Sequence, residues 1–156
     1  MSDIKILVAT MTGTAEMIAE EIQSAYGAAH ELTIHLLDRA DPGILGGAGP
    51  VLVVSSTYGT GDIPDPALGF FESVERTRPD LRHLRYGVVA LGDSTYQDTF
   101  AFGGRRWDAL LAACGASRIG DLLVLDASAG GDMVADAVAW AAPWLERASQ
   151  PGAVAP

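Results

Sequence analysis

The chain has 156 residues, of which 49% are hydrophobic, and a formal net charge of −10 at pH 7. This length fits one domain with a substantial core and is too short for two, and the hydrophobic content argues against a disordered chain. The negative charge argues against a nucleic-acid-binding protein, because nucleic-acid phosphates would be repelled, but it is compatible with docking onto basic partner proteins.

The first element is a short apolar run, residues 4–9, which suits a strand buried on both faces. It stops at a turn rich in hydroxyl groups, Thr10-Met11-Thr12-Gly13-Thr14-Ala15, and a helical pattern follows at once. Backbone N–H groups at a helix N-terminus can bind a phosphate without a cation. The segment therefore predicts a site for one phosphate monoester, with an ordinary helix cap carrying extra threonines as the alternative. A Cβ at position 13 is expected to obstruct the tight turn.

The predicted helix runs over residues 14–26, with Ile18, Ile22 and Ala25 marking its apolar stripe. The alternating pattern of residues 31–37 predicts a half-exposed edge strand, and residues 38–49 predict a loop with at most one helical turn. A second buried strand is predicted at residues 51–55.

The middle of the chain predicts another helix and another buried strand. The helix is capped by Asp65, points Leu68, Phe71 and Val74 inward, and stops at Pro79. Residues 86–91 form the third buried strand, because the run is almost wholly apolar.

In the last third, a helix presents an apolar stripe that ends at Cys114, which we expect to be a buried core thiol. A fifth strand is predicted from Ile119 to Leu125. The final helix starts near Asp132, and Pro143 inside it predicts a kink or a new turn.

The alternation of strands and helices predicts an α/β fold, a parallel sheet with helices on both faces. Each of the three buried strands ends in a polar loop that contains glycine, and ligands of such sheets bind beyond the carboxyl ends of the strands. Two of these loops carry a tyrosine, Tyr58 and Tyr96, which suits a flat heteroaromatic ring. A phosphate site beside a site for a flat ring predicts a mononucleotide.

Three segments resemble the flavodoxin family, in the right order and over nearly the whole chain. They are the phosphate loop at residues 10–16, the loop Ser56-Thr57-Tyr58-Gly59-Thr60-Gly61-Asp62 and the loop Gly92-Asp93-Ser94-Thr95-Tyr96. The stretch at residues 59–64 is most similar to short MioC-type flavodoxins and to the FMN domains of diflavin reductases. No insertion of about twenty residues splits the predicted fifth strand, as in the short-chain branch of the family.

The resemblance implies a three-layer sandwich whose five-stranded parallel sheet has the order 2-1-3-4-5. It implies an FMN-binding domain at residues 1–149, a flexible tail at residues 150–156 and non-covalently bound FMN as the cofactor. It further implies that Gly59 lies beside flavin N5 and that its peptide turns over on reduction. The residues assigned to FMN are Thr10, Met11, Thr12, Gly13, Thr14, Ala15, Ser56, Thr57, Tyr58, Gly59, Thr60, Gly61, Leu91, Gly92, Asp93, Tyr96, Asp98, Thr99 and Phe100.

Two positions depart from the family pattern. Ala15 stands where many members have a threonine that bonds the phosphate, so one hydroxyl group is missing. The segment after Tyr96 is one residue longer than the usual pattern and lacks its cysteine, which leaves the contacts of Phe100 undefined.

The resemblance favours an electron carrier that shuttles single electrons between a separate NAD(P)H-dependent reductase and an acceptor protein, through basic patches on those partners. The alternative is a flavodoxin-like NAD(P)H:quinone oxidoreductase. A signalling receiver is excluded because its acidic sites hold Thr10, Met11, Ser55 and Ser56 here. The chain carries no FAD/NADPH module, so a reductase is expected to be a separate protein.

No catalytic residue or metal-ligand cluster is predicted, and the three histidines lack the spacing of ligands. The N-terminus does not resemble a signal peptide, and no stretch approaches a membrane-spanning length. A cytoplasmic location is therefore expected.

Overall fold

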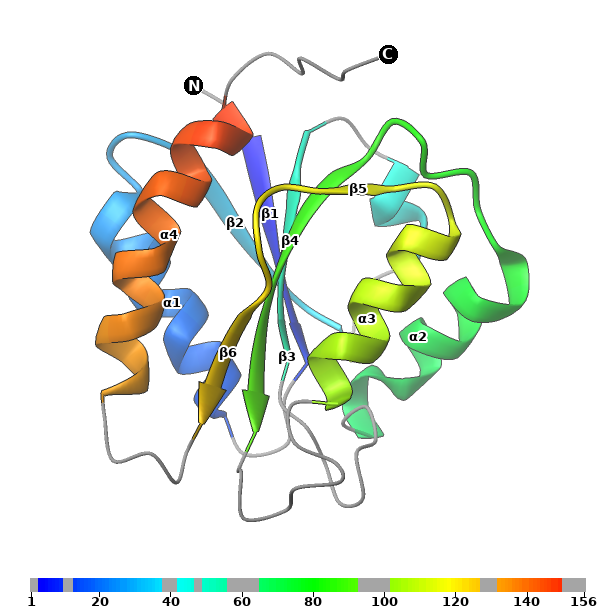
Figure 1. Ribbon diagram of the computed structural model, residues 1–156, viewed down its shortest axis with the longest axis horizontal. Coiled ribbons are helices and arrows are strands. Elements are labelled where there is room, and N and C mark those ends of the chain that lie inside the picture. Colours follow the sequence, from blue (N-terminus) through cyan, green and yellow to red (C-terminus); the bar gives the residue numbers. More distant parts are fainter. Residues whose placement is uncertain are drawn as a thin grey trace.

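The fold is a parallel sheet covered by helices on both faces (Figure 1). The computed structural model describes residues 3–9, 13–37, 42–46, 49–55, 65–92, 102–126 and 132–149. The strands are β1 (Asp3–Ala9), β2 (Glu31–Leu36), β3 (Val51–Ser55), β4 (Arg85–Gly92), β5 (Ser117–Arg118) and β6 (Leu123–Asp126). The helices are α1 (Thr14–Tyr26), the short 3₁₀ helix η1 (Pro42–Gly46), α2 (Asp65–Thr77), α3 (Phe102–Ala113) and α4 (Met133–Ser149).

The strand order is β2-β1-β3-β4-β5, and β6 also pairs with β4. Every pairing between described strands is parallel, so all the arrows in Figure 1 point to the same edge of the sheet. The predicted order 2-1-3-4-5 is confirmed. The helices α1, α2, α3 and α4 all begin at that carboxyl edge, as the right-handed crossovers of such a sheet require.

The sheet separates two apolar clusters, one on each face, because successive strand residues point to opposite sides. In β1, Ile4, Ile6 and Val8 pack with α1 and α4, whereas Leu7 and Ala9 pack with α2, α3 and η1. β3 alternates in the same way and is buried along its whole length. The prediction of strands buried on both faces is thus confirmed for β1 and β3.

Several element predictions are confirmed at the level of single residues. α1 covers residues 14–26, β2 is an edge strand with partly exposed residues, and η1 is the single helical turn expected between residues 38 and 49. Cys114 is a buried free thiol whose pKa is raised by burial. The apolar stripe of α1 differs by one turn, since Ala25 is exposed and Ala15, Ile18, Ala19 and Ile22 are the buried residues.

The predicted fifth strand at residues 119–125 is wrong in its bounds. Two short strands, β5 and β6, stand in its place, and both pair with β4. The chain leaves the sheet between them, where Gly120 has φ of +69°, a backbone conformation that glycine adopts at least cost. Only residues 119–122 separate the two strands, far fewer than the insertion of about twenty residues named above.

Pro143 does not start a new turn, because α4 continues as one helix from Met133 to Ser149. A proline cannot donate to the carbonyl four residues earlier, here that of Ala139. Both residues are exposed, so water can bond this carbonyl. The proline is therefore tolerated within the helix.

Candidate functional site

The candidate site lies at the carboxyl edge of the sheet, where the ends of β1, β3 and β4 are in line. Ala9 is in register with Ser55, and Ser55 is in register with Ala90. Two residues further along, Gly92 pairs with Asp126 at the end of β6. The chain turns to β2 on one side of β1 and to β3 on the other, so the strand order changes direction between β1 and β3. Open parallel sheets bind their ligands at this switch point.

The helix α1 begins at this edge of the sheet, directly after Gly13. Gly13 precedes the helix with φ of 93° and ψ of −7°, in the left-handed region, and among the described residues no side chain makes a capping hydrogen bond there. The first helical bond runs from the N–H of Met17 to the carbonyl of Gly13, at 2.9 Å. The N–H groups of residues 14–16 come before this bond, so they have no acceptor within the helix and point toward its N-terminal side. Such groups, with the positive end of the helix dipole, suit a phosphate.

Ala15 stands in place of the usual threonine, so this turn lacks one hydroxyl group. Its side chain is fully buried and belongs to the apolar cluster between the sheet and α1 with α4. The residue can therefore offer a ligand its backbone N–H but no side-chain group. Leu91, at the end of β4, lies in the same cluster and is 5% exposed.

The structure brings Gly13, Thr14, Ala15, Leu91 and Gly92 to one edge of the sheet. The other residues that the sequence assigns to FMN lie outside the described residues. These are Thr10, Met11, Thr12, Ser56, Thr57, Tyr58, Gly59, Thr60, Gly61, Asp93, Tyr96, Asp98, Thr99 and Phe100. Their assignment stays a prediction.

Residues 6–140 match the family model for flavodoxin. The chain belongs to the flavodoxin family. Flavodoxin YqcA of Escherichia coli K12 is 36% identical over 145 residues, covering 92% of this chain and 97% of that relative. MioC of the same strain is 33% identical over 126 residues, covering 81% of this chain and 84% of MioC. Mouse methionine synthase reductase is 35% identical over 146 residues, covering 90% of this chain but 20% of that reductase.

Solved flavodoxin structures share the fold. A C101A mutant of the Pseudomonas aeruginosa flavodoxin superposes with a TM-score of 0.84 at 32% identity, covering 94% of this chain and 98% of that one. A Fusobacterium nucleatum flavodoxin bound to flavin mononucleotide superposes with a TM-score of 0.78 at 17% identity, covering 94% of this chain and 98% of that one. The resemblance to the flavodoxin family is thus confirmed by both kinds of comparison, and MioC is among the relatives.

Sequence reasoning missed one polar pair beside the flavodoxin site. Ser55, the last residue of β3, is fully buried, and its hydroxyl accepts a hydrogen bond of 3.1 Å from the indole N–H of Trp107 in α3. The stripe of α3 predicts that Trp107 is buried but not what its N–H meets. The available signal was the hydroxyl at the end of a wholly apolar strand, since a buried hydroxyl needs a partner.

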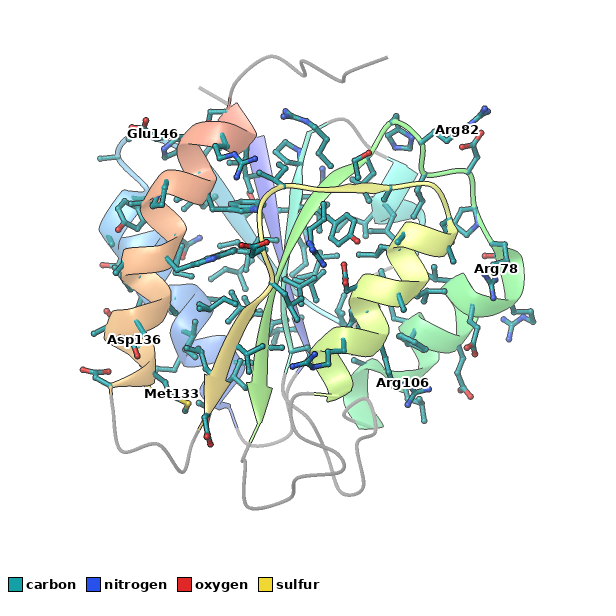
Figure 2. All side chains as sticks on the ribbon, in the orientation of Figure 1. Arg78, Arg82, Arg106, Met133, Asp136 and Glu146 are labelled. Carbon is teal, nitrogen blue, oxygen red and sulfur yellow. The ribbon has the colours of Figure 1, made fainter. Side chains whose placement is uncertain are left out.

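Charge is distributed unequally around this flavodoxin (Figure 2). In α1, Glu16, Glu20 and Glu21 face no basic residue of the same helix, and Asp136 and Glu146 lie on α4 beside it. The labelled arginines Arg78, Arg82 and Arg106 lie on the side of α2 and α3. Among the described residues, the α1 and α4 side therefore carries more acidic than basic side chains, with Arg147 as a basic residue of α4.

Two classes of site find no support in the part of the chain that the structure describes. No group of three or more His, Cys, Asp or Glu side chains there could hold a metal ion. Among the same residues, no helix has the length and apolar character needed to cross a membrane.

Proposed function

We infer that this chain is an electron-transfer flavoprotein whose cofactor is non-covalently bound FMN. The observation that carries this inference is the flavodoxin match over residues 6–140, which spans the strand switch point and the start of α1. Bound FMN accepts and releases electrons one or two at a time, and the protein decides which steps are accessible. Flavodoxins are carriers rather than enzymes, which fits the expected role.

The start of α1 fits the phosphate of FMN. We propose that the backbone N–H groups of residues 14–16, which follow Gly13 at the start of α1, face the switch point. We propose that the hydroxyl groups of Thr10, Thr12 and Thr14 add to these N–H groups. A dianionic phosphate then binds without a cation, because the helix dipole and several charge-assisted hydrogen bonds stabilise it.

The flavin ring is proposed to lie between Tyr58 and Tyr96, with the peptide of Gly59 beside N5. Ser56, Thr57, Thr60 and Gly61 complete one loop. Gly92, Asp93, Asp98, Thr99 and Phe100 belong to the other loop. Leu91 supports the second loop from the core, since it is buried at the end of β4. The FMN-binding domain covers residues 1–149 in this proposal, and residues 150–156 are a flexible tail.

The partners are proposed to be a separate NAD(P)H-dependent reductase and an acceptor protein, in the cytoplasm. The acidic residues of α1 support a basic docking surface on these partners. Met17 lies among them with 47% of its surface exposed, so the same surface also offers an apolar contact. An apolar contact ringed by charges suits a transient complex that forms quickly and dissociates quickly.

An NAD(P)H:quinone oxidoreductase remains the second candidate from the sequence, but the relatives do not favour it. The two candidates differ in one measurement on the purified protein, the oxidation of NAD(P)H with a quinone and no added reductase. We expect no turnover unless a reductase is supplied. Turnover by the protein alone would establish the enzyme instead.

The cofactor proposal is tested by the visible spectrum and by titration of the apoprotein with FMN. We expect flavin bands in the purified protein and release of FMN on denaturation. Thr12→Ala should weaken FMN binding about tenfold or more, because a hydroxyl bond to a charged phosphate is lost. Thr77→Ala is the matched control, since the hydroxyl of Thr77 bonds the carbonyl of Ser73 on α2. A protein that binds no FMN would overturn the proposal.

A further inference from the structure

A buried hydrogen bond joins β3 to α3 directly beside the proposed flavin site. The indole Nε1 of Trp107 donates to the hydroxyl oxygen of Ser55 at 3.1 Å. Trp107 is 1% exposed and Ser55 is fully buried, so water does not compete for either group. A hydrogen bond in such surroundings is strong, and removal of the Ser55 hydroxyl takes this acceptor from the buried indole N–H of Trp107.

The indole ring is held in a fixed orientation by two aromatic neighbours. Phe71 meets it edge to face, with ring centroids 4.8 Å apart and an interplanar angle of 84°. Phe70 lies with its centroid 6.0 Å away at 53°. Both neighbours belong to α2, so the orientation of the indole ring is also set by an element other than the strand that carries Ser55.

The first turns of α3 are also held close to the sheet. Gly104, one turn before Trp107, packs on Ala90 of β4, and a Cβ there would lie 2.7 Å from the Cα of Ala90. Ala90 is in register with Ser55. The helix therefore contacts two neighbouring strands at the same level of the sheet, through Gly104 on β4 and through Trp107 on β3.

We propose that Trp107 is a positioning residue for FMN and that it acts through Ser55. Ser55 is the residue from which the chain enters the segment carrying Tyr58, and α3 is the helix that the chain enters after the segment carrying Tyr96. The Trp107–Ser55 bond ties these two points together and sets the spacing of the two loops around the ring. This inference rests on the proposed function, because it concerns the same FMN site.

The chain contains a matched control for this bond. Trp144 of α4 is 3% exposed and packs over Gly87 on the opposite face of the sheet. Its Nε1 is buried and has no hydrogen-bond partner among the residues that the structure describes. Trp→Phe at either position removes an indole N–H and a similar volume from the core, but only position 107 loses a hydrogen bond to the end of β3.

The experiment compares Trp107→Phe, Trp144→Phe, Ser55→Ala and the double variant Trp107→Phe/Ser55→Ala, each titrated with FMN as apoprotein. Trp107→Phe should raise the dissociation constant of FMN about threefold to tenfold. It should also raise the residual flavin fluorescence of the fully loaded protein, because looser loops stack less tightly on the ring. Ser55→Ala should have the same two effects. The double variant should bind FMN no more weakly than the weaker-binding single variant, because both substitutions remove the same hydrogen bond.

Several outcomes decide the matter. The inference is overturned if Trp107→Phe binds FMN with wild-type affinity and fluorescence, if Trp144→Phe has an equal effect, or if the two effects at positions 107 and 55 simply add. Should Trp107→Phe fail to fold, Ser55→Ala carries the same test against Trp144→Phe. A wild-type protein that binds no FMN contradicts the proposed function itself, and unchanged binding in the variants of a flavin-loaded wild type contradicts only the role of Trp107.

Discussion

The two faces of the sheet each bury one tryptophan, but they treat its N–H group differently. On the α2/α3 face, Trp107 donates to Ser55 at the carboxyl edge of the sheet. On the α1/α4 face, Trp144 stacks on Trp140, with centroids 6.0 Å apart, and packs over Gly87, nearer the amino end of β4. The same side chain is thus hydrogen-bonded at the edge that holds the candidate site, whereas the Trp144 N–H has no partner among the described residues. Apolar burial supplies stability on both faces, and the hydrogen bond from Trp107 lies at the end of β3, next to the site.

The faces differ in charge as well. The α1 helix carries three glutamates and no basic residue, whereas α3 carries Arg105 and Arg106 against Asp108. Arg106 lies over the ring of Phe71, 5.1 Å from its centroid, which places a cation on the α2/α3 face. One face therefore presents acid beside the start of α1, and the other presents mixed charge.

The largest effect is expected where a helix touches the sheet most closely. Gly104→Ala should lower the free energy of unfolding by about 2 kcal/mol, because the new Cβ meets the backbone of Ala90, which cannot move aside. Chemical denaturation of the two proteins measures this difference. A loss of this size would show that the α2/α3 face depends on a contact between the backbone at Gly104 and Ala90. On the α1/α4 face, the corresponding contact at Gly87 is made by a side chain, the Trp144 ring.

Gly69→Ala provides the control for this substitution. Gly69 lies in α2, and a Cβ there would meet no described atom within 4 Å. Alanine favours a helix over glycine by about 0.5–1 kcal/mol, so Gly69→Ala should stabilise the protein by that amount. If both substitutions stabilise the protein, the close contact at Gly104 does not constrain α3.

The sequence predicted the order of the sheet and the bounds of α1 because apolar periodicity reports burial directly. It could not predict the break between β5 and β6, since Ser117 and Arg118 are exposed and show no alternation, and their pairing with β4 is made by the backbone. It could not predict the Trp107–Ser55 bond either. A stripe shows which face of a helix is buried, but not which group 52 residues away it meets.

Gly13 has a left-handed backbone, which the structure shows, whereas the obstruction by a Cβ stays a prediction because residues 10–12 of the turn lie outside the described residues. The sequence predicted that a Cβ would obstruct the turn, but a Cβ there meets no described atom within 4 Å. The requirement comes from φ of 93°, which disfavours residues with a Cβ. The chemistry of the remaining site could be predicted only through the resemblance, because a single sequence does not show how loops from different strands meet.

The next largest effect concerns this glycine. Gly13→Ala should cost about 1–2 kcal/mol of stability and weaken FMN binding, because the start of α1 must adopt a strained conformation. Gly13→Asn should cost less, since asparagine tolerates left-handed backbone better. Thermal unfolding and FMN titration measure the two consequences. Gly46→Ala is the control, because Gly46 has no positive φ and a Cβ there also meets no described atom within 4 Å.

Equal losses for Gly13→Ala and Gly46→Ala would remove backbone conformation as the reason for glycine at position 13. A loss of stability with unchanged FMN affinity would instead separate the fold of this turn from phosphate binding. The start of α1, on the acidic side of the molecule, would then lose its support as the phosphate site.

The smallest effect is expected from Tyr86, on the α2/α3 face and away from the site. Its buried hydroxyl donates to the Asp108 carboxylate at 2.5 Å, and Arg118 donates to the same carboxylate at 2.8 Å. Burial first, and then this hydrogen bond, raise the pKa of Tyr86 above its ordinary value near 10. Tyr86→Phe should cost about 1 kcal/mol at neutral pH, the usual worth of one hydrogen bond, because Arg118 still pairs with the Asp108 carboxylate in the variant.

The same pKa shift predicts how this difference changes with pH. Because the folded protein holds the Tyr86 proton more tightly than the unfolded chain, the contribution is fully present below about pH 10 and is lost as pH rises toward the raised pKa. The wild-type free energy of unfolding should fall by up to about 1.4 kcal/mol per pH unit there, and Tyr86→Phe should lack this component. Urea unfolding on both sides of that pH should then show the two proteins converging in alkali. Parallel pH profiles would mean that the folded protein does not raise the pKa of Tyr86.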